Sequence, residues 1–170
     1  LTGLFNRRFF DNALRTEFSR HKRSGSQLSL IMLDVDHFKK YNDHYGHLEG
    51  DTCLQKIAHT LKTMVERAPD IVARYGGEEF VVILPETNTE DALVVGEKLR
   101  STIEQRAFQD SRDTYHITAS FGQACSKPAV EDNFDKNALI NQADQALYEA
   151  KDKGRNRVVG YTLKKKWFNF

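Results

Sequence analysis

Residues 71–84 read Ile-Val-Ala-Arg-Tyr-Gly-Gly-Glu-Glu-Phe-Val-Val-Ile-Leu. Two short β-favouring runs, 71–75 and 80–84, flank a Gly-Gly-Glu-Glu turn, which predicts a β-hairpin. Gly76 and Gly77 permit positive φ and leave space where a phosphate could approach the backbone. The turn also carries the acidic pair Glu78 and Glu79, which taken alone would indicate only a solvated loop.

A second acidic pair follows the run Leu28–Val35, which is apolar almost throughout and predicts a strand buried on both faces. Asp34 and Asp36 stand where that strand emerges. If it lies beside the hairpin in the sheet, the two acidic pairs converge on one edge. Converging carboxylates repel unless a hard cation lies between them, and Mg²⁺ held by one or two carboxylates plus phosphate oxygens is the usual solution.

The remaining chain alternates helical and strand patterns. Thr87 and Glu90 have capping-box spacing and predict the start of a helix. The element order favours an α/β (α+β) fold with one central mixed five-stranded sheet flanked by helices. Helices are expected at 10–18, 38–45, 54–65, 92–103 and 139–150, strands at 28–35, 71–75, 80–84, 117–121 and 158–161, and loops at 21–26, 109–114 and 122–132. The strand at 117–121 alternates as a half-buried strand does.

Composition sets outer limits on function. The chain has 170 residues, which fits one domain, and a formal net charge of +1, so nucleic acid is not an expected partner. Cys53 and Cys125 have no metal-binding spacing and are expected to be buried thiols in a reducing cytoplasm. No apolar run approaches the ~18 residues of a membrane span.

Three cations are placed to meet a phosphate: Lys39, five residues beyond Asp34, and Lys151 and Arg155 at the end of the last helix. For Lys151 and Arg155 the structural alternative is that they are solvated and offset the helix dipole.

Four motifs resemble those of the GGDEF family of diguanylate cyclases, in the family's order and over residues 1 to about 160. The signature turn has Glu where the family's name has Asp, a variant found among active members. The resemblance implies a nucleotidyl cyclase or polymerase palm-like fold, with a catalytic domain at 1–161 and a tail at 162–170. The motifs are LTGLFNRR at 1–8, DVDHFKKYNDHYGHLEGD at 34–51, RYGGEEF at 74–80 and ADQALYEAKDKGRNR at 143–157.

The expected reaction is the condensation of two GTP molecules into cyclic di-GMP with release of two pyrophosphates. The resemblance implies that Asp34, the backbone carbonyl of Val35 and Glu78 hold the catalytic metal, Mg²⁺ or Mn²⁺, with Glu79 as a further ligand. Glu78 is also the candidate general base for the 3′-hydroxyl. Lys39 is the residue expected to stabilise charge in the transition state.

For the substrate, the resemblance implies that Asn42 and Asp51 recognise the guanine edge and that His47 lines the same pocket. The structural alternatives are that Asn42 caps the short helix and that Asp51 starts the next one. Lys151 and Arg155, with Lys39, are then expected to contact the triphosphate. The resemblance also implies that one subunit binds one GTP, so catalysis is expected to require a homodimer.

Arg67-Ala-Pro-Asp70 resembles the family's RxxD inhibitory motif at the expected distance before the turn. It implies feedback binding of cyclic di-GMP at Arg67 and Asp70, with Arg20 completing the site from another subunit. The alternative is an ordinary ion pair at an exposed helix end, worth ~1 kcal/mol or less.

Two other functions stay open at this point. One is a non-catalytic module that binds GTP or cyclic di-GMP, although Asp34, Glu78 and Glu79 are all present and favour an enzyme. The other is a cyclase that forms a mononucleotide or accepts ATP. The resemblance implies a cytoplasmic domain behind an N-terminal sensory domain, and leaves open whether the parent protein is anchored in the inner membrane.

Overall fold

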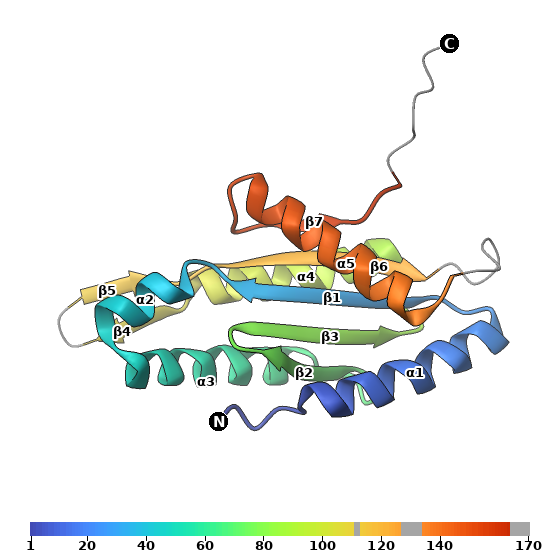
Figure 1. The fold of residues 1–170 in the computed structure, drawn as a ribbon, viewed down its shortest axis with the longest axis horizontal. Coiled ribbons are helices and arrows are strands. Elements are labelled where there is room, and N and C mark those ends of the chain that lie inside the picture. The colour runs from blue at the N-terminus through green and yellow to red at the C-terminus, as the bar shows by residue number, and fades with distance from the viewer. Residues whose placement is uncertain (111–112, 127–133, 164–170) are drawn as a thin grey trace, which may run out of the picture.

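The computed structural model describes residues 1–110, 113–126 and 134–163. These residues form one central sheet with helices on both faces and a separate small hairpin (Figure 1). The helices are α1 (Arg7–Ser24), α2 (Phe38–Tyr45), α3 (His47–Met64), α4 (Thr89–Gln105) and α5 (Lys136–Asp152). The strands are β1 (Leu28–Val35), β2 (Ile71–Gly76), β3 (Glu79–Pro85), β4 (Ala107–Asp110), β5 (Asp113–His116), β6 (Ala119–Ser126) and β7 (Val158–Gly160).

The central sheet has five strands in the order β2-β3-β1-β6-β7. β1 lies in the middle and pairs antiparallel with β3 and β6, whereas β6 and β7 are parallel. The predicted α+β fold with a mixed five-stranded sheet is therefore confirmed.

Side chains of β1 alternate between two hydrophobic clusters. Ile31 and Leu33 belong to the cluster that includes the apolar faces of α3 and α4, and Leu30 and Met32 to the one that includes α1 and α5. Helices cover both faces, so most positions need an apolar side chain, and this explains the nearly continuous apolar run.

Helix α5 lies unusually close to β6. A Cβ atom added at Gly122 would lie 2.2 Å from both Ala143 O and Leu147 N, so only glycine permits this approach. The contact fixes the position of α5, whose last turn carries Lys151.

The strand and loop predictions between residues 107 and 126 are wrong in part. The expected loop at 109–114 includes parts of β4 and β5, which pair antiparallel. β4 and β5 pair with each other and not with the central sheet, and their polar sequence has no apolar alternation that would have predicted strands. β6 begins at Ala119 and runs on to Ser126, and it is buried almost throughout because α4 and α5 both pack on it. Of the loop expected at 122–132, residues 127–133 lie outside the described part.

The helix starts also differ from prediction. Asn88, not Thr87, caps α4, because the Thr87 hydroxyl donates to Pro85 O instead. α3 begins at His47, two turns before the apolar stripe that predicted it.

Cys53 is buried as expected, but Cys125 is only partly buried, which corrects that prediction. Of the predicted tail, residues 164–170 are not among those described.

Candidate active site

The two acidic pairs do meet at one end of the sheet. Asp34 of β1 is the register partner of Glu79 of β3, and Val35 N donates to Glu78 O at 3.3 Å. The condition on which the predicted metal site depended, that the first strand lies beside the hairpin, is therefore confirmed.

The turn that presents these acids is held by its own chain. Gly77 has φ +43°, in the left-handed region, whereas Gly76 has no positive φ. Arg74 clamps the turn by donating to Gly77 O from Nε at 2.9 Å and from Nη2 at 2.7 Å. Glycine is thus required for backbone conformation at one of the two positions.

Lys151 of α5 reaches the same place. Its Nζ lies 3.0 Å from Asp34 Oδ2, and the Asp34 side chain is only 14% exposed. Lys151 therefore neutralises a buried carboxylate of the sheet, which corrects the alternative that it is merely a solvated cation at the helix end.

Two carboxyl groups of this cluster hold their protons more tightly than usual. Burial, and then the charges of Glu78 and Asp36, raise the pKa of Asp34 although the ion pair with Lys151 opposes the shift. Burial followed by the charge of Asp34 raises the pKa of Glu79. The site thus holds more negative charge than Lys151 compensates.

These donors fit a hard cation bound together with phosphate. Among the residues that the structure describes, no three His, Cys, Asp or Glu side chains form a ready-made metal cluster. Mg²⁺ does not need one, because it commonly takes one or two carboxylates and fills its shell with water and phosphate oxygens. Asp34, Glu78 and Glu79 supply oxygen ligands at a position where added positive charge would relieve their repulsion.

The raised pKa of Asp34 gives a test of this cluster. Because the folded state binds that proton more tightly than the unfolded chain does, the carboxylate costs stability above its raised pKa, and the cost disappears as the pH falls towards 3.8. Asp34→Asn is therefore expected to raise the melting temperature by a few degrees at pH 7.5 and by less in acid. Thermal unfolding at several pH values measures this, with Asp43→Asn on the exposed face of α2 as the control. A lower melting temperature would mean that the bond to Lys151 outweighs burial.

Asn42 lies beside Gly50, where α2 packs against α3. A Cβ at Gly50 would lie 1.7 Å from Asn42 Oδ1, and this buried oxygen has no hydrogen-bond partner. Asn42 lies inside α2 and caps nothing, and Asp51 is in the second turn of α3, so both structural alternatives are wrong. A buried amide oxygen without a partner calls for an explanation, and a donor from a ligand would supply one.

The other predicted substrate residues are exposed around this region. Lys39 is in the first turn of α2, and His47 is the first residue of α3. Asp51 and Arg155 are also exposed. Within the described residues none of these four side chains has a hydrogen bond or an ion pair, so each is free to meet a ligand.

Arg67 and Asp70 form a close pair beyond the end of α3. Arg67 Nη2 lies 2.7 Å from Asp70 Oδ1 and 2.7 Å from Pro85 O, and it also donates to the Thr87 hydroxyl at 3.0 Å. The Asp70 side chain is 6% exposed and that of Arg67 52%. The pair is therefore bonded to the end of β3, and about half of the Arg67 side chain stays exposed although its Nε and Nη2 both donate within the chain.

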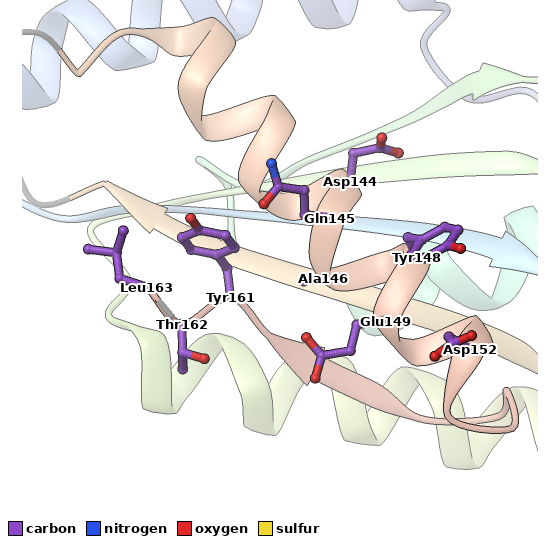
Figure 2. Close-up of a pocket in the computed structure, with 9 residues that line it drawn as sticks. All are labelled: Asp144, Gln145, Ala146, Tyr148, Glu149, Asp152, Tyr161, Thr162 and Leu163. Carbon is purple, nitrogen blue, oxygen red and sulfur yellow. The ribbon is translucent and has the colours of Figure 1, made fainter. Parts of the chain in front are cut away.

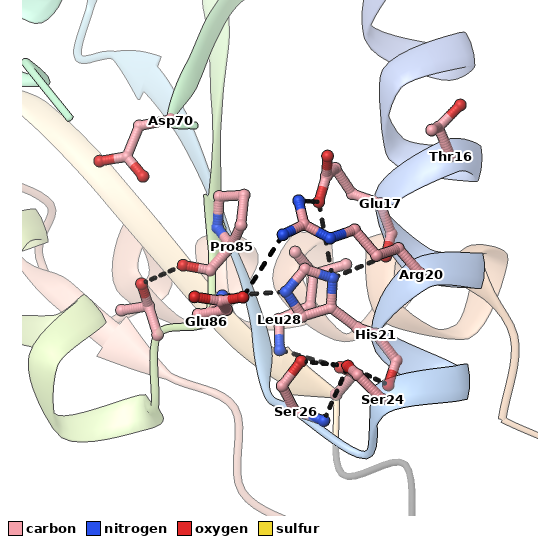
Figure 3. A network of polar contacts seen from close by, with 12 residues as sticks. Thr16, Glu17, Arg20, His21, Ser24, Ser26, Leu28, Asp70, Pro85 and Glu86 are labelled. Atoms are coloured by element: carbon pink, nitrogen blue, oxygen red, sulfur yellow. Dashed lines mark hydrogen bonds and ion pairs between the residues drawn. The ribbon is translucent and has the colours of Figure 1, made fainter. Parts of the chain in front are cut away.

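Arg20 contacts its own chain (Figure 3). Its guanidinium is 3.6 Å from Glu17 and 3.5 Å from Glu86. The neighbouring His21, which the sequence did not single out, is buried and accepts from Glu86 N at 2.9 Å. These contacts tie α1 to the segment after β3, next to the Pro85 carbonyl that Arg67 uses.

Asp36 has a different role from Asp34. It is 4% exposed and accepts hydrogen bonds from the hydroxyls of Thr118 and Ser120 at 2.7 and 2.6 Å and from Asn156 N at 3.0 Å. Although it belongs to the same acidic pair in the sequence, it is bonded within the protein. The spacing alone did not distinguish a ligand from a buried hydrogen-bond acceptor.

A groove of about 570 Å³ lies along the outer face of α5 (Figure 2). Asp144, Tyr148 and Asp152 line one side and Tyr161 to Leu163 the other. None of the predicted site residues lines it. Asp144 contributes to the raised pKa of Glu79, so the groove borders the acidic cluster without being part of it.

Comparison with known proteins agrees with this fold. The family model described as "Diguanylate cyclase, GGDEF domain" matches residues 1–157. The chain is 44% identical over 158 residues to the diguanylate cyclase DgcP of Pseudomonas aeruginosa, covering 93% of this chain and 23% of that protein. The chain belongs to the GGDEF domain family of diguanylate cyclases. It spans 23% to 45% of the lengths of the curated relatives it matches.

Two solved structures share the whole architecture. The GGDEF domain of DgcB from Caulobacter crescentus, in complex with c-di-GMP, has a TM-score of 0.88 at 33% identity, covering 95% of this chain and 91% of that one. The active GGEEF domain of a diguanylate cyclase from Vibrio cholerae has a TM-score of 0.87 at 33% identity, covering 95% and 99%. In the described part of this chain, no helix combines the length and apolarity needed to cross a bilayer.

Proposed function

We propose that this chain is a catalytic domain, residues 1–161, that condenses two GTP molecules into cyclic di-GMP. The observation that carries the proposal is the facing pair Asp34 and Glu79, in register on adjacent strands, with Lys151 of α5 bonded to Asp34 at 3.0 Å. It joins three of the four motifs at one end of the sheet. Family membership and the shared fold support the same reaction.

In this reaction a 3′-oxygen attacks the α-phosphorus of a second GTP, and pyrophosphate leaves. Asp34, the Val35 carbonyl, Glu78 and Glu79 would hold Mg²⁺ or Mn²⁺, which supplies positive charge to the attacking and leaving oxygens. Within the described residues the carboxylate of Glu78 has no hydrogen bond or ion pair, and it would accept the proton of the 3′-hydroxyl. Catalysis is then mainly positioning and electrostatic stabilisation.

Three cations are expected to contact the triphosphate. Lys39 on α2 and Arg155 beyond α5 have free, exposed side chains, and Lys151 already lies at the carboxylates. When GTP is bound, Lys151 exchanges its contact with Asp34 for a phosphate oxygen, which leaves Asp34 free for the metal. Each subunit binds one GTP, so two subunits must face each other to bring the 3′-oxygen to the second α-phosphate.

Guanine binds between α2 and α3, where the unpartnered Asn42 Oδ1 accepts from the base, and Asp51 and His47 complete the pocket. Gly50→Ala tests this, because its methyl group must displace the Asn42 carboxamide. We expect the KM for GTP to rise by about tenfold or more, a loss of roughly 1.4 kcal/mol. Steady-state kinetics measure it, with Glu49→Ala on the exposed face of α3 as the matched control. An unchanged KM would contradict the role of Asn42.

The proposed activity is tested with purified dimeric protein, GTP and Mg²⁺ or Mn²⁺. Release of pyrophosphate and formation of cyclic di-GMP, identified by mass spectrometry, are the expected results. Tight binding of GTP without either product would instead favour a non-catalytic binding module. A mononucleotide product, or equal turnover of ATP, would correct the substrate assignment.

We also propose that cyclic di-GMP inhibits the domain by binding at Arg67 and Asp70. Arg67 offers a planar set of donors suited to a phosphate or to the Hoogsteen edge of guanine, and Asp70 accepts from guanine donors. The half-exposed Arg67 side chain and its anchoring to Pro85 O and Thr87 support this site. Arg20 of a second subunit completes it after leaving its contacts with Glu17 and Glu86.

A further inference from the structure

The turn between α5 and β7 is held in an unusual backbone conformation. Gly154, Arg155 and Asn156 have φ of +108°, +63° and +45° in succession. Glycine tolerates this region and asparagine visits it, but for arginine it is unfavourable. Such residues persist only where the surrounding structure determines their conformation, and they concentrate at ligand clamps.

Contacts from two other elements fix Asn156. Its side chain accepts from Arg100 Nη1 at 2.8 Å and donates to Glu104 Oε1 at 2.8 Å, so α4 holds one side of the turn. Its backbone N–H donates to Asp36 Oδ2 at 3.0 Å, so the end of β1 holds the other side. Arg155 N donates to Ala150 O at 3.0 Å.

Asp36 is the link from this turn to the catalytic strand. It lies two residues after Asp34, and its carboxylate accepts from Ser120 and Thr118 as well as from Asn156. Among the described residues no cation pairs with it. Burying a carboxylate among three neutral donors costs free energy. This cost suggests that the position of the Asp36 carboxylate is needed.

Within the described residues the exposed side chain of Arg155 has no hydrogen bond or ion pair. Lys151, the residue after the Ala150 that anchors the turn, is bonded to Asp34. The chain Asp34, Asp36 and Asn156 thus joins the carboxylate cluster to the backbone that carries Arg155. Any rotation of the turn would change where this guanidinium lies relative to Asp34.

We infer that Asp36 is a positioning residue that fixes the turn at 154–156 and thereby directs Arg155 at the β- and γ-phosphates of bound GTP. This rests on the proposed nucleotide site. It gives the second acid of the DVD sequence a role separate from the metal: the first binds the ion, and the second holds the cation that meets the phosphates.

The experiment compares binding of a non-hydrolysable GTP analogue and of GMP to the dimeric protein by calorimetry. Asp36→Asn keeps the side-chain shape but replaces one acceptor oxygen by a donor. It is expected to weaken binding of the analogue by about tenfold and to change binding of GMP, which lacks the outer phosphates, by less than about twofold. Asp152→Asn at the exposed end of α5 removes the same charge without changing a residue of the turn. It is expected not to weaken binding of the analogue.

Because Asp36 acts through Arg155, the double variant Asp36→Asn, Arg155→Ala is expected to bind the analogue no more weakly than Arg155→Ala alone. The inference would be overturned if the losses of binding affinity in the two single variants added up in the double variant. It would also be overturned if Asp36→Asn weakened binding of the analogue and of GMP equally. An Arg155→Ala protein that binds the analogue as wild type does would overturn it as well. Should Asp36→Asn fail to fold, Asn156→Ala releases the other side of the same turn from α4 and must show the same selective loss. The proposed guanine site is tested separately by the wild-type protein: if it does not bind GMP, that site is wrong.

Discussion

Glu78→Gln is expected to lower the rate of cyclic di-GMP formation by about a thousandfold or more while the protein stays folded. Glu78 stands in the turn between β2 and β3, and Val35 N is bonded to its backbone carbonyl, so the turn keeps its place when the side chain changes. Glutamine has nearly the same shape but carries no charge for the metal and cannot take the proton of a 3′-hydroxyl. The loss should therefore appear in turnover.

Pyrophosphate release at saturating GTP measures this effect, and thermal unfolding checks the fold. Glu90→Gln, in the exposed first turn of α4, removes the same charge far from the turn and is the matched control. The same loss in turnover is not expected for Glu79→Gln, because Glu79 is only a further ligand in the proposed site. Turnover near wild type in Glu78→Gln would refute the assignment of this residue to metal and base.

Arg67→Ala is expected to weaken inhibition by cyclic di-GMP by about a hundredfold, because it removes the guanidinium that this subunit contributes to the proposed product site. The GTP reaction itself should be nearly unaffected, since Arg67 lies at the opposite end of β3 from Glu79. A modest loss of stability should accompany the change, because Asp70, only 6% exposed, loses its partner.

Initial rates over a range of added cyclic di-GMP, together with calorimetric titration of the product, measure the effect. Arg67→Lys is the informative control, because it keeps the charge for Asp70 but not the planar pair of donors, and so should restore stability more than product binding. Tight product binding in Arg67→Ala would reject the site. Arg67 and Asp70 would then be an ordinary structural ion pair.

Much of the fold could be read from local pattern. The apolar run Leu28–Val35, the Gly-containing hairpin and the helical stripes each follow from side-chain periodicity, which is a property of neighbouring residues. The failures have a common cause. The ladder between β4 and β5 and the full burial of β6 depend on which segments come together in space, and polar strands or small buried residues such as Ser120 give no local signal of it.

The site shows the same division. The residue types in the motifs established that carboxylates, cations and an asparagine were available, and the resemblance assigned them to metal, phosphate and base. Only the register of β1 against β3 placed Asp34 opposite Glu79, and only the close seating of α5 on Gly122 brought Lys151 to Asp34.

The acids Asp34 and Asp36 separate what the sequence and the tertiary structure each determined. In the sequence they are an equivalent pair at the end of a buried strand. Because Asp36 lies just beyond the end of β1, where the alternation of the strand has ended, the two side chains meet different surroundings. Asp34 meets Lys151 and the hairpin acids, and Asp36 meets two hydroxyls and the strained turn at Asn156. Sequence determined that two carboxylates stand there, and packing decided which is free to bind a ligand.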